Sequence, residues 1–594
     1  MSYVSEKPNN FRTELGLSVF KGKYALTSEE TWLQRAQAIV DDVCGTRKGT
    51  VPPLMSKADR KELAHRIHTH RFLPGGRYIY YAGRGVAFYS NCLAYRGEED
   101  TREEWGRLCH SASDALMSGS GIGIDYSVFR ERGALLSRTG GTASGPLPLA
   151  KSINEIGRNV MQGGSRRSAI YGSLNWQHPD APEWLAVKDW DNVTIPGTDI
   201  TYGTAKRQDF NASAPLDSTN ISLNYDDEWI AAILRGSPDA DTTRLDLDLP
   251  WTDPDRWTAL VENAQLPETF VKNVEMALRN GEPGFSFNFR HQQRETLRNA
   301  CTEFVSEDDS DVCNLGSINM AAIEDLDDFK ATVELASKFL VCGTIRGQLP
   351  DEKSRRTREK NRRLGLGLMG MHEWLLQRGH RYGFNGELNS WLQAYVEHSE
   401  SAANEHCDRF FLSRPVAYRA IAPTGTIGIL AGSTTGIEPI FAVAYKRRYI
   451  DGNRETGIER RMYQYYVDAG AQDLINRYDI DPNTIESAID LAQDPIRRLQ
   501  FQADVQFYVD MAISSTINLP AWGSEYNNPD LVDRMARAIA TYAPRLRGLT
   551  TYPDGARGGQ PLVSVPYEEA INNGLGIAYE ENSENACKSG VCGI

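Results

Sequence analysis

The pattern of apolar and polar positions changes along the chain at about residue 85. Before it, helical spacing dominates, as in TSEETWLQRAQAIVDDV (27–43), which opens with a Ser-x-x-x capping pattern. After it, short apolar runs alternate with longer helical stretches such as 267–281 and 388–410. The short runs include GIGIDYS (121–127), AIYGSLNW (169–176), STNISLNY (218–225) and TIGILAGS (426–433). This alternation predicts an α/β fold behind a helical N-terminal region.

Three regions are expected from this pattern. A helical N-terminal region covers 1–85, an α/β region covers 86–560, and 561–594 form a flexible tail whose end, AYEENSENACKSGVCGI, is acidic, polar and glycine-bearing. The 594 residues exceed one ordinary hydrophobic core, so one very large domain or two to three smaller ones are expected.

Charge and hydropathy exclude several classes of protein. The formal net charge of −14 argues against electrostatic binding of nucleic acid, and the basic segment KSRRTREKNRR (353–363) is interpreted as a solvated helix face. The sequence has no run of about 18 apolar residues, which is the length needed to cross a membrane, and the N-terminus shows no secretory signal. We therefore expect a cytoplasmic protein without membrane or direct nucleic acid partners.

The nine cysteines are too few for a disulfide scaffold, and none forms a CxxC pair. The histidines near residue 68 have no cysteine beside them, so we expect no metal site. Cys301 and Cys313 flank an acidic run, and this spacing alone leaves a metal site, a disulfide loop and a redox centre open. Cys587 and Cys592 lie in the polar tail, where they are either incidental thiols or a dithiol that exchanges with another disulfide.

Two glycine-rich segments invite a nucleotide interpretation. GLGLMG (365–370) fits GxGxxG but follows a charged segment instead of an apolar strand, so we expect helix packing through small residues there. APTGTIGILAGSTTG (422–436) places small and hydroxylated residues at a strand or helix start, where successive backbone amides can bind phosphate. From chemistry alone, a phosphate site and an ordinary turn are equally supported.

Several motifs occur in a specific order along the chain: SNC (90–92), SGSGIGID (118–125), MQGGSRRSA (161–169), NACTE (299–303), CNLGSIN (313–319), APTGTIG (422–428), TTGIEPIF (434–441) and the tail CKSGVC (587–592). In this order they resemble the catalytic chain of a ribonucleotide reductase, from about residue 60 to the C-terminus. The resemblance implies a ten-stranded α/β barrel with a central finger loop. It also implies reduction of ribonucleotides to 2′-deoxyribonucleotides.

The resemblance assigns the radical chemistry to the NxCxE motif. Cys301 would become a thiyl radical that abstracts the 3′ hydrogen, in a barrel that excludes solvent and oxidants. Glu303 would be the general base on the 3′ hydroxyl, and Asn299 would orient the sugar. The two reducing electrons would come from Cys92 and Cys313, which finish as a disulfide.

The remaining motifs imply binding and turnover roles. Cys587 and Cys592 would re-reduce the active-site disulfide, with thioredoxin or a glutaredoxin-type protein as reductant. Substrate would contact Asn91 and Gly121 near the sugar and base, and its phosphate would lie at the turn formed by Thr424, Gly425, Thr426 and Ile427. Gln162 and Arg166 would belong to a loop through which a dNTP or ATP effector selects the base.

The source of the radical separates the classes within the family. Class I chains receive it from a ferritin-like subunit through two adjacent tyrosines near the last barrel strand, where this chain has GLTTYPDGARGG (548–559) with a lone Tyr552. Tyrosine pairs occur elsewhere, at 80–81 and 465–466. The segment 548–559 and the 12-residue step from Cys301 to Cys313 resemble class II, in which adenosylcobalamin supplies the radical.

We therefore expect an adenosylcobalamin-dependent homodimer that accepts diphosphates. The alternatives are a class I large subunit with a ferritin-like partner, and a non-catalytic nucleotide-binding scaffold.

Overall fold

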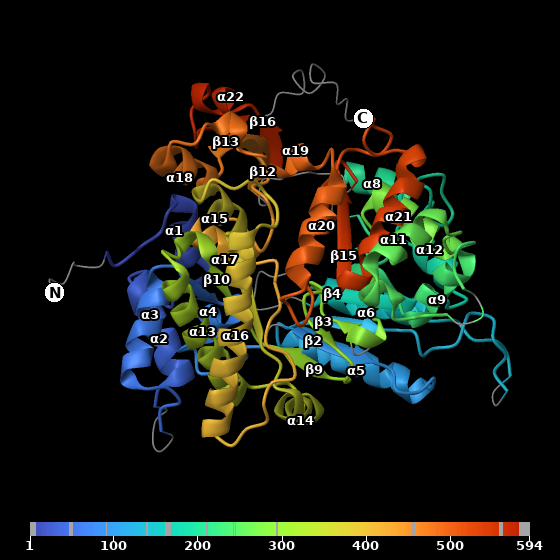
Figure 1. The fold of residues 1–594 in the computed structure, drawn as a ribbon, viewed down its shortest axis with the longest axis horizontal. Coiled ribbons are helices and arrows are strands. Elements are labelled where there is room, and N and C mark those ends of the chain that lie inside the picture. Colours follow the sequence, from blue (N-terminus) through green and yellow to red (C-terminus); the bar gives the residue numbers. More distant parts are fainter. Residues whose placement is uncertain are drawn as a thin grey trace.

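The computed structural model describes residues 7–46, 52–90, 92–137, 140–160, 168–209, 212–241, 243, 245–292, 295–453, 458–556 and 562–580. Within these ranges, no helix combines the length and the apolar character needed to cross a bilayer. Helices lie on both sides of a central group of strands (Figure 1).

The N-terminal region is helical, as predicted. Its elements are α1 (Glu14–Val19), the π-helix η1 (Phe20–Tyr24), α2 (Trp32–Cys44), α3 (Lys57–His68) and α4 (Gly76–Tyr81). The cap of α2 lies later than the Ser-x-x-x pattern indicates: the Thr31 hydroxyl accepts from the Gln34 amide, and the Gln34 side chain accepts from the Thr31 amide. This reciprocal capping box satisfies two amides that the first helical turn cannot.

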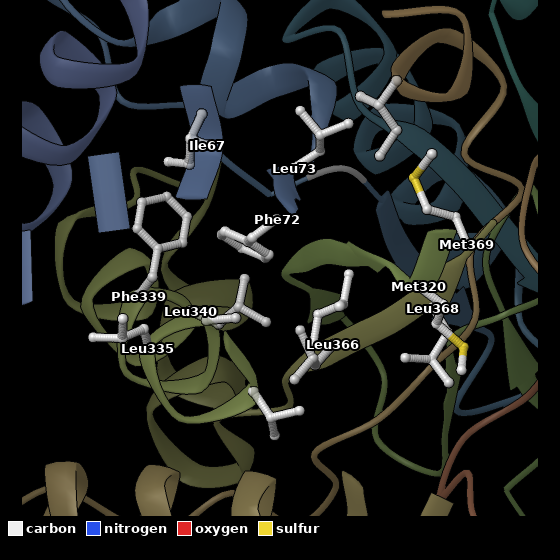
Figure 2. Close-up of a cluster of buried hydrophobic side chains, with 14 of the residues drawn as sticks. Ile67, Phe72, Leu73, Met320, Leu335, Phe339, Leu340, Leu366, Leu368 and Met369 are labelled. Atoms are coloured by element: carbon white, nitrogen blue, oxygen red, sulfur yellow. The ribbon is translucent and has the colours of Figure 1, made fainter. Parts of the chain in front are cut away.

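The helical N-terminal region shares a hydrophobic core with the α/β region. Strand β1 (Phe72–Pro74) pairs antiparallel with β10 (Leu315–Asn319), which brings Phe72 opposite Ile318. Phe72 also contacts the ring of Phe339 on α13 (Leu326–Arg346), and Figure 2 shows both rings among buried side chains that include Leu340 and Leu366. Burial of this shared apolar surface joins the two regions.

The largest sheet has eight strands in the order β14-β15-β6-β5-β4-β3-β2-β9. Neighbouring strands from β2 to β6 are parallel, whereas β9 is antiparallel to β2 and β15 is antiparallel to β6. The bounds are β2 (Cys92–Arg96), β3 (Gly121–Asp125), β4 (Ile170–Asn175), β5 (Thr219–Tyr225), β6 (Gly284–Phe287), β9 (Asp311–Cys313), β14 (Thr516–Leu519) and β15 (Gly548–Pro553).

A second group of parallel pairings connects the two ends of this sheet. β10 pairs with β11 (Gly365–Met369), a bridge joins Leu366 to Arg419, and another joins Ile421 to Ile513, just before β14. Only Asn314 separates β9 from β10. The pairings therefore lead from β2 through β6, β15, β14 and β11 back to β9 and β2.

The parallel strands β3 to β6 alternate between apolar and polar side chains. One set packs outward against helices and includes Ile122, Ile124, Ile170, Leu174, Ile221, Leu223, Phe285 and Phe287. The other set is polar and buried, and includes Asp125, Ser173, Ser222, Asn224 and Ser286. Because successive side chains of a strand point to opposite faces, the second set forms a polar inner wall.

GLGLMG is a buried strand, β11, and the expectation of helix packing through small residues was wrong. A Cβ at Gly365 would lie 2.4 Å from the Leu315 side chain and 3.0 Å from the Cys313 sulfur, and a Cβ at Gly367 would lie 2.7 Å from the Ala420 carbonyl oxygen. The glycines therefore permit close approach of neighbouring strands, which a local motif does not reveal.

The basic segment 353–363 binds the acidic run that precedes Cys313. Part of it forms α14 (Glu352–Asn361), whose Arg355, Arg356 and Lys360 side chains form the exposed helix face that the charge pattern predicts, whereas Arg358 and Arg363 are buried. Its ion pairs are Lys353–Asp309 at 2.7 Å, Lys360–Asp308 at 2.9 Å and Arg363–Asp311 at 2.8 Å. The acidic run thus has a structural role: it ties β9 to α14.

The other elements surround these sheets. Helices of the first half are α5 (Arg102–Met117), α6 (Leu147–Asn159), α7 (Ala181–Ala186), α8 (Tyr202–Gln208), α9 (Asp227–Gly236), α10 (Leu249–Thr252), α11 (Pro254–Asn263) and α12 (Glu268–Asn280). Later helices are α15 (Met371–Gln377), α16 (Gly386–Arg409), α17 (Gly425–Ala431), α18 (Ala469–Tyr478), α19 (Ala488–Leu491), α20 (Pro495–Gln506), α21 (Val532–Tyr542) and α22 (Tyr567–Asn572). Short 3₁₀ turns are η2 (Arg290–Gln292), η3 (Met320–Ala322), η4 (Pro482–Thr484), η5 (Pro529–Leu531) and η6 (Ala543–Arg545).

A separate four-stranded antiparallel sheet lies near the C-terminal end of the described chain. Its order is β16-β12-β13-β17, with β12 (Ala444–Asn453), β13 (Ile458–Val467), β16 (Leu562–Val565) and β17 (Ala578–Glu580). In Figure 1 it lies at the top of the molecule beside α22.

Candidate active site

The NACTE motif lies in a short hairpin. Strands β7 (Leu297–Arg298) and β8 (Val305–Ser306) pair antiparallel, and the loop between them carries Asn299, Cys301 and Glu303. Thr302 adopts a left-handed conformation with φ of 68°, and its amide donates to the Asn299 carbonyl at 3.1 Å. This turn reverses the chain directly at Cys301.

The hairpin packs between strands of the two groups of pairings. Its apolar side chains form a cluster with residues of β2, β9, β10 and the segments around 420 and 511: Ala94, Leu297, Phe304, Val305, Cys313, Leu315, Ala417, Ala420, Ala422, Met511 and Ala512. On the opposite side, a Cβ at Gly123 would lie 1.7 Å from the Arg298 carbonyl oxygen, so β3 accommodates the hairpin backbone only because residue 123 is glycine. Contacts on both sides hold the loop.

Burial separates the three residues of the NxCxE motif. Asn299 and Glu303 are 0% and 1% exposed, whereas Cys301 is partly exposed. The Asn299 amide donates to Glu303 Oε1 at 2.7 Å, and its Oδ1 accepts from the Phe304 amide at 3.2 Å. Glu303 Oε2 has no hydrogen-bond partner among the described residues. A buried carboxylate oxygen on the same loop as the partly exposed Cys301 is thus available to accept a proton.

Desolvation changes the acidity of Glu303. Burial raises its pKa to about 7, against the opposing effect of the hydrogen bond from Asn299. A general base is most effective when its pKa lies near the operating pH. Glu303 therefore suits proton transfer near neutrality.

Strand register brings Cys92 and Cys313 together. They are directly opposed on β2 and β9, and neither is in a disulfide. Directly opposed residues of an antiparallel pair have Cβ atoms about 4.5–5.5 Å apart, and the Cα separation of such a pair lies within the range of disulfides. Burial, followed by the nearby Glu303 and Cys92, raises the pKa of Cys313 well above its usual value. Cys313 is therefore a protonated thiol directly opposite Cys92, an arrangement from which a disulfide can form.

Gly121 lies between the dithiol and the loop. A Cβ at this position would be 3.1 Å from the Cys92 sulfur and 3.2 Å from the Ala300 Cβ. The structure therefore brings Gly121, Cys92, Cys313 and the Cys301 loop into one site.

The predicted phosphate turn lies just beyond the apolar cluster around Phe304. Thr424 has φ of 52° and precedes α17, whose first two residues are Gly425 and Thr426. The Thr424 hydroxyl accepts a hydrogen bond from the Gly436 amide at 3.0 Å, which ties the turn to the TTGIEPIF segment. Gly425 is exposed, and the first amides of a helix have no partners within the helix. Ile427, by contrast, packs into the core.

Five predicted site residues lie outside the described part of the chain: Asn91, Gln162, Arg166, Cys587 and Cys592. Their roles remain predictions.

Two residues that the motifs did not single out contact the loop. The Asn220 side-chain amide donates to the Ala300 carbonyl at 3.4 Å, and the Arg298 guanidinium is buried at the base of the hairpin. Asn220 alternates with Ser222 and Asn224 in STNISLNY, and this period-two pattern of polar residues in an apolar run was the available signal. Arg298 had no comparable signal.

Tyr552 lies on β15, where it follows the buried Thr551. The Thr551 hydroxyl donates to the Ala277 carbonyl at 2.8 Å. The tandem tyrosines lie on other elements, 80–81 on α4 and 465–466 on β13.

A cavity of about 730 Å³ has no cysteine in its lining. Its lining comes from the N-terminal segment, the end of β10, α15 and α18, and includes Arg12, His70, Asn319, Arg378, Arg477 and Tyr478. No predicted site residue lines it, so the cysteine site and this cavity are distinct.

The family model described as "Ribonucleotide reductase, barrel domain" matches residues 90–399 and 414–552. The chain belongs to this family. The ribonucleotide reductase match covers the hairpin, both facing cysteines and the turn at Thr424. The chain thus has the α/β fold of the ribonucleotide reductase barrel domain.

Two curated relatives are named vitamin B12-dependent ribonucleoside-diphosphate reductase. The protein of Mycobacterium tuberculosis (strain CDC 1551 / Oshkosh) is 26% identical over 86% of this chain and 74% of its own length. That of Thermoplasma acidophilum is 24% identical over 91% of this chain and 72% of its own length. Among solved structures, the Actinobacillus ureae class Id ribonucleotide reductase alpha subunit is similar with a TM-score of 0.66 and 15% identity, over 92% of this chain and 98% of that chain. This structural likeness concerns the fold.

Proposed function

We propose that this chain reduces ribonucleotides, preferably diphosphates, to 2′-deoxyribonucleotides for DNA precursor synthesis. One observation carries the proposal: Cys92 and Cys313 face each other beside a buried loop that presents Cys301 and Glu303. The names of the two relatives, which refer to diphosphates and vitamin B12, support it.

Each residue of the loop has a step in this chemistry. A thiyl radical at Cys301 takes the 3′ hydrogen atom of the sugar and regains an S–H bond. Glu303 then accepts the proton of the 3′ hydroxyl, and Asn299 orients the sugar and the carboxylate. The loop must hold Cys301 and Glu303 accurately against the sugar, because a misplacement of about 1 Å can lower the rate of a reaction step about 100-fold.

The dithiol supplies the reducing equivalents. The 2′ hydroxyl takes up a proton and leaves as water, and the sugar receives two electrons from Cys92 and Cys313. The two thiols lose two protons and two electrons and form one S–S bond. Cys301 finally returns its hydrogen atom to the 3′ carbon, so the net reaction consumes only the dithiol.

The strand pairings support a closed ten-stranded barrel around this loop. The ten strands are obtained when the segment around 420 and the segment 513–519 each count as one strand, and β9 and β10 together count as one. They form two sets of parallel strands, and the two sets meet in antiparallel pairings. The hairpin at 297–306 would be the finger loop. We propose limits of 1–85 for the helical region, 86–560 for the barrel and 561–594 for a segment that ends in the redox cysteines. The first part of this last segment is not the flexible tail that its composition predicts, because β16 and β17 pair with β12 and β13.

We propose adenosylcobalamin as the cofactor. When bound, it supplies a 5′-deoxyadenosyl radical. The residue that must meet this radical is Cys301, and the site fits this requirement, because Cys301 is partly exposed whereas its neighbours Asn299 and Glu303 are buried. Thr551 before Tyr552 further favours this source over a tyrosine pair on β15.

The binding partners are proposed from the motifs. Thr424, Gly425, Thr426 and Ile427 would hold the substrate phosphate, while Asn91 and Gly121 would lie near the sugar and base. Gln162 and Arg166 would sense a dNTP or ATP effector. We further propose a cytoplasmic homodimer that thioredoxin or a glutaredoxin-type protein reduces.

An assay without a second subunit tests the radical source. The purified chain is incubated with adenosylcobalamin and a small dithiol, with CDP or CTP as substrate, and deoxyribonucleotide is measured. We expect turnover with faster reaction of CDP. Activity that appears only after a ferritin-like protein is added would instead establish class I, and reaction of CTP alone would overturn the diphosphate preference.

Loss of the tail cysteines is expected to separate the first turnover from later ones. In Cys587→Ser or Cys592→Ser, the prereduced enzyme should form about one product per chain and then stop with thioredoxin, because the Cys92–Cys313 disulfide is not re-reduced. A small dithiol that reaches the site directly should restore repeated turnover. Equal loss in single-turnover assays would contradict the shuttle role.

A further inference from the structure

Arg298 ends the first strand of the loop hairpin and directly precedes Asn299. Its side chain is only 2% exposed, although it carries a guanidinium group. Burial lowers its pKa to about 9, with a further contribution from the positive charge of Arg547. A cation is desolvated at such cost only where many acceptors surround it.

The guanidinium binds oxygens from three segments. Nη1 donates to the carbonyls of Glu295 at 2.5 Å and Leu297 at 3.2 Å. Nη2 donates to the Phe287 carbonyl at 3.1 Å, the Asn288 side chain at 2.7 Å and the Arg547 carbonyl at 3.1 Å. Phe287 ends β6 and Arg547 precedes β15, so Arg298 joins the hairpin to the place where the two antiparallel halves meet.

A buried ion network holds the other strand of the hairpin. The Ser306 hydroxyl on β8 donates to Asp311 Oδ2 at 2.7 Å, and Asp311 pairs with Arg363 at 2.8 Å. Arg363 pairs with Glu295 at 2.7 Å, and Glu295 also pairs with Arg547. The network thus connects β8 to the same two residues, Glu295 and Arg547, that Arg298 contacts through their carbonyls.

We propose that Arg298 is a positioning residue that fixes the Asn299–Glu303 loop relative to the barrel wall. The proposal rests on the function proposed above. Arg298 contacts no reacting atom. It acts through its own backbone, because the Arg298 carbonyl oxygen packs directly against Gly123. A lysine at this position retains the charge but cannot span carbonyls in three directions, because it lacks the planar fork of the guanidinium.

The test compares Arg298→Lys with Arg35→Lys in the full chain with adenosylcobalamin and dithiol. Arg35 is an equally buried arginine that donates to the carbonyls of Ile79 and Ala82 in the N-terminal region. For Arg298→Lys we expect kcat to fall about 100-fold and KM to change less than about threefold, because hydrogen transfer is sensitive to about 1 Å whereas the phosphate turn lies on another element. We expect Arg35→Lys to retain kcat even if its melting temperature falls equally.

Two further measurements separate positioning from general destabilisation. With 3′-deuterated CDP, the isotope effect on kcat should increase in Arg298→Lys, since a longer transfer distance makes hydrogen abstraction rate-limiting. Amide hydrogen exchange of 299–304, measured on the chain without cofactor, should accelerate in Arg298→Lys and not in Arg35→Lys. Unchanged loop exchange, or equal loss of kcat in both variants, would overturn the proposal. A wild-type chain that reduces no nucleotide would instead refute the proposed function, and the exchange measurement would still decide the role of Arg298.

Discussion

Replacing Cys301 with serine is expected to abolish deoxyribonucleotide formation, with a loss of about 10⁴-fold or more, while nucleotide binding persists. Serine has nearly the same size, but its O–H bond is much stronger than an S–H bond, so no radical equivalent to the thiyl forms. The candidate phosphate turn at Thr424 lies on a different element from the loop and is not altered. Product formation and equilibrium binding of CDP are the measurements.

Cys109→Ser is the matched control for this substitution. Cys109 is the other described cysteine with intermediate exposure, and it lies on α5 outside the barrel strands. Its loss should leave the rate unchanged. Deoxynucleotide formation retained by Cys301→Ser, or an equal decrease in both variants, would disprove the radical role of Cys301.

Glu303→Gln is expected to lower kcat by about 10²–10⁴-fold, because glutamine keeps the shape and the acceptor for Asn299 but cannot take up a proton. In the wild-type enzyme, kcat/KM should increase with pH and level off above about 7, where the carboxyl is ionised. The measurement is the pH profile of CDP reduction. A profile that remains flat from pH 6 to 8 would contradict the assignment of Glu303 as the base.

The same substitution should affect stability with a defined sign. The pKa of Glu303 rises on folding from 4.5 to about 7, so its protonated form is favoured in the folded chain. The contribution of the protonated carboxyl group to the free energy of unfolding is fully present below pH 4.5 and is lost as the pH increases through 7. Glu303→Gln should therefore raise the free energy of unfolding by about 2–3 kcal/mol at pH 8 and leave it nearly unchanged at pH 4.5. Denaturant unfolding at both pH values measures this; destabilisation at pH 8 would mean that the carboxylate is stabilised by charge, not desolvated.

Some structural features could be predicted locally. Short apolar runs indicated β3, β4 and β5, and helical spacing indicated α2, α12 and α16. GLGLMG could not be assigned in this way, because its strand depends on the contact of Gly367 with the Ala420 backbone, which lies far away in the sequence. TIGILAGS likewise became helix α17, although it is as short and apolar as the strands.

By itself, the sequence determined the order of the motifs, the chemistry that their residues can perform and the α/β alternation. It could not decide which thiols meet. The antiparallel register of β2 and β9 opposes Cys92 and Cys313, while Cys301, much closer to Cys313 along the chain, lies on a separate hairpin. Tertiary structure also decided the pKa of Glu303 and the burial of Arg298, because desolvation depends on atoms that several distant strands contribute. The acidic run before Cys313 acquired its role in the same way, since its basic partners on and beside α14 become neighbours only when the barrel forms.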